Sequence, residues 1–120
     1  NWAGYFGAGN VRIENILSVN SVTLTDDLIN VWEASNASPM ETTGKTSITT
    51  NYSGTLSTIN GGVDGKEIIV LTLGSVTDFD ETGNIVNLPS DSVAMNANGV
   101  IKFKYYTSIS KWVCTCVENN

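Results

Sequence analysis

Apolar and polar side chains alternate near the C-terminus, and nowhere in the sequence do apolar residues recur at helical spacing over three turns. Ile101, Phe103 and Tyr105 alternate with two lysines, and the alternation resumes after a short polar stretch. A period of two is typical of strands with one buried face. Residues 100–106 and 111–117 are therefore predicted to form an antiparallel hairpin.

Other short segments rich in Val, Ile, Leu and Thr are also predicted to be strands, and glycine-rich or polar stretches separate them. The expected strands are residues 11–17, 22–25, 28–33, 46–50, 55–59, 67–73, 84–88 and 93–95. The expected connections are residues 34–45, 60–66 and 74–84. Residues 67–73 are the most hydrophobic of these segments, so we expect them to form a central strand. Only 15% of the residues are charged, which is too few for a helical bundle.

The strand spacing favours an all-β chain folded as an antiparallel β-sandwich with jelly-roll-like connections. Residues 11–120 are expected to form this single domain, with no internal repeat, after an irregular N-terminal arm at residues 1–10. Both faces of residues 28–33 and 67–73 are apolar, so we expect a neighbouring subunit to cover one of them. Because the sequence begins at Asn1 rather than at methionine, we expect a piece of a longer protein.

The composition argues against several function classes. The net charge of −6 disfavours binding to nucleic acid, and apolar runs of only a few residues disfavour membrane insertion. The absence of histidine removes the commonest general base and nearly all transition-metal sites. We therefore expect no enzyme, no catalytic residues, no metal and no cofactor. A glycosidase or autoprotease that uses only carboxylates remains an alternative.

Local motifs favour structural roles. The glycine-rich residues 60–66 lack the ending of a phosphate-binding loop and precede a strand, so a tight turn is expected. Acidic residues between 78 and 91 do not match a calcium-binding loop, which favours a solvated acidic loop. Cys114 and Cys116 are expected to be reduced and buried, on the same strand face as Trp112.

A series of turn and core residues in the second half resembles the C-terminal β-domains of bacteriophage tailspikes, tail fibres and other virion appendages. The matching segments are residues 59–71, 76–78, 83–85, 99–103 and 111–112. They contain a Gly-Gly-x-Asp-Gly turn before a hydrophobic strand, a Gly-Asn-Ile strand, a strand that begins at glycine, and a closing strand with tryptophan. The resemblance spans about residues 55–117.

The resemblance implies a homotrimeric all-β cap behind a longer fibrous or β-helical shaft. It implies that this chain is a trimerisation and assembly module that contacts the host surface, located in the virion and synthesised in the bacterial cytoplasm. The alternative is a monomeric carbohydrate-binding module of a larger secreted enzyme, and the mass in solution separates the two.

Candidate binding residues for a host-surface glycan lie in two polar segments that combine an aromatic ring with hydrogen-bonding groups. They are Tyr52, Asp78, Phe79, Asp80 and Glu81.

Overall fold

The computed structural model describes residues 32–74 and 77–119. This part of the chain contains strands and turns but no helix, and therefore no helix able to span a membrane. The strands are β1 (Glu33–Ala34), β2 (Met40–Glu41), β3 (Ser47–Thr50), β4 (Gly54–Leu56), β5 (Ile59–Asn60), β6 (Glu67–Thr72), β7 (Thr77–Asp80), β8 (Ile85–Val86), β9 (Ser92–Met95), β10 (Val100–Tyr106) and β11 (Lys111–Glu118). The predicted all-β class is confirmed, whereas the expected arm and the strands before residue 32 lie outside the described residues.

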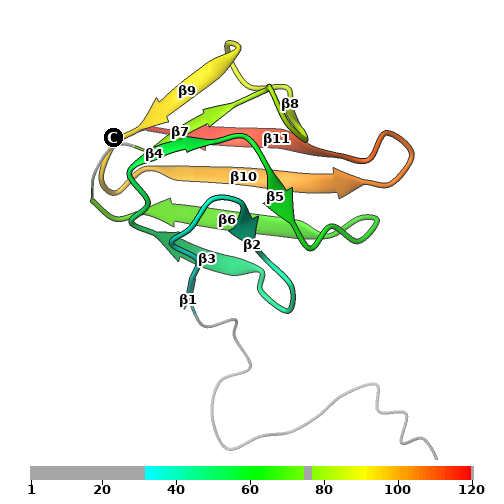
Figure 1. Ribbon diagram of the computed structural model, residues 1–120, viewed down its shortest axis with the longest axis horizontal. Helices are drawn as coiled ribbons and strands as arrows, with labels where there is room; N and C mark the ends of the chain where they lie inside the picture. Colours follow the sequence, from blue (N-terminus) through cyan, green and yellow to red (C-terminus); the bar gives the residue numbers. More distant parts are fainter. Residues whose placement is uncertain (1–31, 75–76, 120) are drawn as a thin grey trace, which may run out of the picture.

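The strands form three sheets (Figure 1). The largest has the order β1-β3-β6-β10-β11-β8, and the smaller ones are β2-β5 and β4-β7-β9. The predicted hairpin is confirmed, because β10 and β11 pair in antiparallel register from Val100–Glu118 to Tyr106–Lys111. The predicted central strand is also confirmed, since β6 lies between β3 and β10.

Parallel pairings outnumber antiparallel ones, so the prediction of an antiparallel sandwich is wrong in this respect. Of the eight pairings among the described strands, five are parallel. From β3 in the six-stranded sheet, the chain passes to β4 in the three-stranded sheet and β5 in the two-stranded sheet. It then returns to the six-stranded sheet with β6 and to the three-stranded sheet with β7. The strands β1 to β7 therefore form a short coil, in which β1, β3 and β6 stack in one sheet, β2 and β5 in another, and β4 and β7 in the third.

The last coil strands are covered by the C-terminal segment. β10 pairs with β6, β9 pairs with β7, and β11 pairs with β8. β5 is covered instead by side chains: Asn84 accepts from the Ile59 amide at 2.8 Å and donates to the Ile59 carbonyl at 2.7 Å. The Trp112 indole nitrogen donates to the same carbonyl at 3.0 Å. Asn84 thus takes the place of a neighbouring strand for β5.

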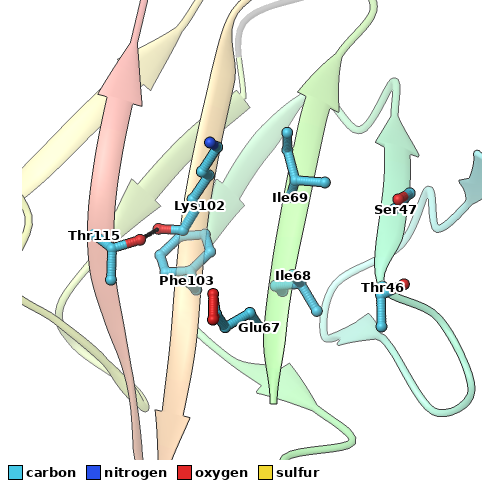
Figure 2. A pocket seen from close by; sticks show the side chains of 8 residues that line it. All are labelled: Thr46, Ser47, Glu67, Ile68, Ile69, Lys102, Phe103 and Thr115. Carbon is cyan, nitrogen blue, oxygen red and sulfur yellow. Dashed lines mark hydrogen bonds between the residues drawn. The ribbon is translucent and has the colours of Figure 1, made fainter. Parts of the chain in front are cut away.

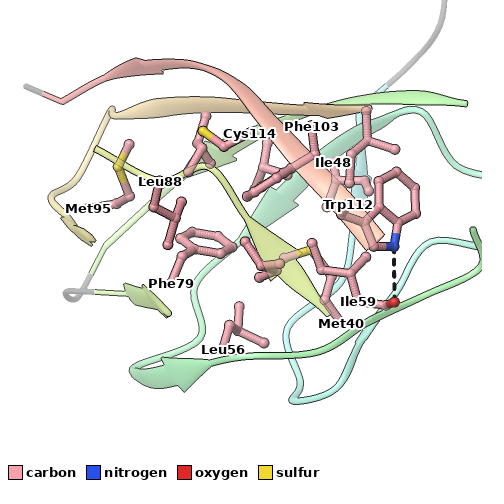
Figure 3. Packing of buried hydrophobic residues seen from close by; sticks show 14 residues of the cluster. Met40, Ile48, Leu56, Ile59, Phe79, Leu88, Met95, Phe103, Trp112 and Cys114 are labelled. Atoms are coloured by element: carbon pink, nitrogen blue, oxygen red, sulfur yellow. Dashed lines mark hydrogen bonds between the residues drawn. The ribbon is translucent and has the colours of Figure 1, made fainter. Parts of the chain in front are cut away.

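The hydrophobic core lies between the inner face of the six-stranded sheet and the two smaller sheets (Figure 3). Phe103 and Trp112 come from the hairpin, while Leu56, Phe79 and Met40 come from the smaller sheets. The Phe79 and Phe103 rings lie 5.5 Å apart between centroids, so they join the two sides of the core. Large, fully buried side chains of this kind each contribute roughly 1.5–3 kcal/mol.

Residues 74–84 were predicted to form a connection, but they contain the strand β7. Two further predicted segment boundaries are also wrong. Residues 34–45 were predicted to form a connecting loop, but they contain β2, and Met40 is fully buried in the core. Residues 55–59 were predicted to form one strand, but β4 and β5 are separate and belong to different sheets. In both cases a bend carries the chain from one coil sheet to the next, and residue composition does not encode that bend.

Candidate functional site

The five candidate binding residues have mainly structural roles. Phe79 is completely buried in the core, so it is not available to a glycan, which corrects the prediction for this residue. It belongs to β7, where alternation turns its ring inward between the half-buried Asp78 and Asp80. Tyr52 is half-buried against the core, and its ring packs over the backbone of Gly54.

The acidic side chains Asp80 and Glu81 support the segments on either side of β8. Asp80 accepts hydrogen bonds from the Thr82 amide at 3.1 Å and the Thr82 hydroxyl at 2.7 Å. Glu81 accepts from the Leu88 amide at 2.7 Å. Within the described ranges, no group of His, Cys, Asp and Glu side chains is arranged to hold a metal ion. Of the three candidate acids, Asp78 is half-buried and makes no hydrogen bond of the kind that Asp80 and Glu81 make.

The glycine-rich segment forms a compact turn, as its sequence predicted. Gly61 and Gly65 have φ values of 95° and 83°, which a side chain would strain. The amine of Lys66 donates to the carbonyls of Thr42 and Gly61, so this segment is tied to the bend after β2. Burial lowers the pKa of Lys66 from its ordinary value.

A groove of about 270 Å³ crosses the outer face of the six-stranded sheet (Figure 2). Its lining comes from β3, β6, β10 and β11 and from the residue before β3. The lining residues are Thr46, Ser47, Glu67, Ile68, Ile69, Lys102, Phe103 and Thr115. Ile68 and Phe103 belong to the core, whereas Ser47, Ile69 and Lys102 occupy one cross-strand row on the outer face.

The outer face combines apolar and charged side chains. In β6, Ile69 and Leu71 are half-buried and alternate with the buried core residues Ile68 and Val70. The following residue on this face, Leu73, is 47% exposed. No other described strand covers this face. The apolar character predicted for both faces of residues 67–73 is therefore present, and one of those faces is open among the described residues.

A β-bulge separates the two cysteines, which were predicted to share one face. Phe103 pairs with Cys114 and Lys102 pairs with Cys116, so Thr115 is the extra residue. Cys114 therefore points into the core with Trp112, as predicted, while Cys116 is half-buried on the outer face with Lys102. Both cysteines are free. Burial raises the pKa of the Cys114 thiol above its ordinary value of 9.0.

An apolar tip lies beside the hairpin turn. We define it as Val63, Tyr106 and Ile109, which are 64%, 39% and 54% exposed. Two turns form the tip and are joined by a hydrogen bond from the Thr107 amide to the Asp64 carboxylate at 2.9 Å. The sequence places Val63 and Ile109 in turns and Tyr106 at the end of a strand, but only the antiparallel register of β6 and β10 brings the two turns together.

Comparison with known proteins gives no family. No family model and no curated protein matches the chain. A solved structure described as "Structure of a chaperone-substrate complex" is similar with a TM-score of 0.49 and 18% sequence identity. The similarity covers 62% of this chain but only 13% of that one. A likeness at this level supports no statement about function.

Proposed function

We propose that this chain is the C-terminal trimerisation and assembly module of a bacteriophage tailspike or tail fibre. It would be located in the virion tail appendage after synthesis in the host bacterial cytoplasm. The architecture that we propose is a sandwich-like cap, in which the six-stranded sheet faces the two smaller sheets across one core. Its role is structural, without catalysis, and it includes contact with the host surface.

One observation carries the proposal: among the described residues, the coil has an open side and a covered side. In each sheet, the first described strand along the chain, β1, β2 or β4, is an edge strand. The opposite sides of β5, β6 and β7 are covered by Asn84, β10 and β9 respectively. In the described structure, a further coil turn can therefore continue the coil at β1, β2 and β4, on the side of the earlier strands. This polarity is what a terminal cap on a β-helical shaft requires, and open edges otherwise promote unwanted pairing.

Oligomeric mass is the first test of this function. Sedimentation equilibrium at micromolar concentration is expected to give three times the chain mass of 12.8 kDa. A trimer supports the assembly module. A monomeric mass contradicts it and supports the alternative, a monomeric carbohydrate-binding module of a larger secreted enzyme.

We place the host contact at the apolar tip rather than around Phe79. Exposed apolar side chains rimmed by polar groups mark interaction sites, and sugar rings bind through their apolar faces and hydroxyls. The tip has this character, because Asp64, Thr107 and Ser108 border its apolar residues in the two turns. Replacing Val63, Tyr106 and Ile109 by serine in the intact appendage is expected to reduce adsorption to host cells at unchanged assembly. The matched control variant replaces the exposed residues Thr55 and Ser92. If both variants adsorb equally to host cells, the tip is not the host contact.

A further inference from the structure

We infer that the outer face of the six-stranded sheet is the surface through which copies of this chain contact one another. This inference rests on the proposed trimeric function and specifies the interface. The outer face is defined here as the outward residues of β3, β6, β10 and β11. In register across these strands, one row contains Ser47, Ile69, Lys102 and Cys116, and the next contains Thr49, Leu71, Val100 and Glu118.

The apolar part of the outer face is continuous across the central strands. Leu71 pairs with Val100, and both are half-buried. Ile69 lies two residues from Leu71 on the same face, and Leu73 extends the strip beyond the end of β6. Covering such a strip stabilises a complex by roughly 25 cal/mol for each Å² of apolar surface removed from water.

The charges on this face identify a second copy as the occupant. Glu67 lies on β6, while Lys102 and Lys104 lie on β10, and Glu118 ends β11. Lys111, which pairs with the outward Tyr106, adds a base on β11. The face therefore carries charges of both signs, whereas the whole chain carries a net charge of −6. Because each copy is acidic overall, two copies repel one another at a distance, which is unfavourable for association. Through this face they meet opposite charges.

The charged groups are also free to pair with a neighbour. Glu67 is directly opposite Lys104 in the β6-β10 register, yet no ion pair within 4.0 Å joins them or Lys102 in the described part of the chain. The Lys104 amine lies 5.7 Å from the centroid of the Tyr106 ring instead. The β6 half of the face thus carries the acid Glu67, whereas the β10 and β11 half carries more bases than acids. This asymmetry suits a head-to-tail contact, in which the β6 half of one copy meets the β10 half of the next and a closed ring forms.

The direction of the sheet is consistent with such a ring. β1, β3, β6 and β10 follow one another across the sheet, so the outer face runs along the stacking direction of the coil (Figure 1). Copies that contact through it lie side by side. The edge strands β1, β2 and β4 then remain accessible for pairing with another coil turn.

Charge reversal tests the interface without disturbing the core, because Glu67 and Lys102 are both exposed. Glu67→Lys and Lys102→Glu are each expected to raise the trimer dissociation constant at least tenfold, since each places like charges against a neighbour. The double variant Glu67→Lys/Lys102→Glu restores opposite charges and is expected to recover most of the affinity. Thr55→Lys, on an exposed position of β4, is the matched control and is expected to assemble normally. Circular dichroism and urea unfolding confirm that each variant is folded.

Cys116 supplies a second readout, because it lies in the same row as Lys102. In a Cys114→Ala background it is the single thiol, and its labelling is expected to be slow in the assembly and at least tenfold faster in the Lys102→Glu variant. A trimer whose mass and Cys116 labelling are insensitive to both reversals overturns the interface but leaves the proposed function intact. A wild-type monomer overturns both.

Discussion

Replacing Asn84 by alanine tests whether this side chain completes the coil. The substitution removes the two hydrogen bonds to Ile59, of 2.8 and 2.7 Å. The Ile59 carbonyl keeps the Trp112 indole as its donor. The Ile59 amide keeps no partner in the described structure, and the residue is only 1% exposed.

The expected loss of stability follows from these two groups. Leaving a buried amide without an acceptor costs roughly 1–3 kcal/mol, and the second bond contributes about 1 kcal/mol more. We therefore expect Asn84→Ala to lower the free energy of unfolding by about 2–4 kcal/mol, out of roughly 5–15 kcal/mol for a natural domain. Asn84→Asp keeps an acceptor for the Ile59 amide but faces the Ile59 carbonyl with an oxygen, so an intermediate loss is expected.

Urea unfolding followed by tryptophan fluorescence measures the effect, at one protein concentration because assembly contributes to stability. With a typical slope, the midpoint is expected to fall by roughly 1–3 M. Asn60→Ala is the control, because its side chain makes one exposed hydrogen bond to Glu41 at 3.2 Å. It is expected to change stability by less than about 0.5 kcal/mol. Equal losses for Asn84→Ala and Asn60→Ala would refute the role of Asn84.

Two further changes probe the packing. A Cβ at Gly83 would lie 2.1 Å from the Ser57 carbonyl oxygen. Gly83→Ala is therefore expected to destabilise the fold by at least about 2 kcal/mol. Gly74 has open space around it, so Gly74→Ala is the control and is expected to change the urea midpoint little. The raised pKa of Cys114 means that the folded chain keeps a proton that the unfolded chain loses above pH 9.0. The free energy of unfolding is therefore expected to fall as the pH rises from 9.0 towards the folded pKa. Cys114→Ala should reduce this loss of stability between about pH 8 and about pH 10. The same loss of stability in the variant would contradict the assignment to Cys114.

The sequence predicts the strands that have one buried face better than the connections between them. The alternation of Ile101, Phe103 and Tyr105 correctly places β10, including its bounds, because burial on one side of a sheet imposes a period of two. Met40 gives no such pattern. It stands alone among polar residues, and only the stacking of β2 on β5 makes its position part of the core.

The coil itself could not be read from the sequence. Glu33 pairs with Ile48, whereas Ser47 pairs with Ile69, so successive coil turns differ in length and leave no fixed repeat. The sequence does not reveal the β-bulge either, in which one extra residue, Thr115, places Cys116 on the opposite face from Cys114. For the candidate site, an aromatic residue beside acids indicated exposure at Phe79, but strand alternation places that ring in the core.

The covering of β6 by β10 also has a consequence for the order of folding. β3 and β6 can pair as soon as residues 47–72 have left the ribosome, but β10 follows only after a further stretch of chain has been synthesised. During that interval the most hydrophobic strand has one unpaired edge, and such an edge recruits strands from other chains. Nascent chains that stop before residue 100 are therefore expected to aggregate. The hairpin that completes the sheet thus also ends the period in which the growing polypeptide is open to misassembly.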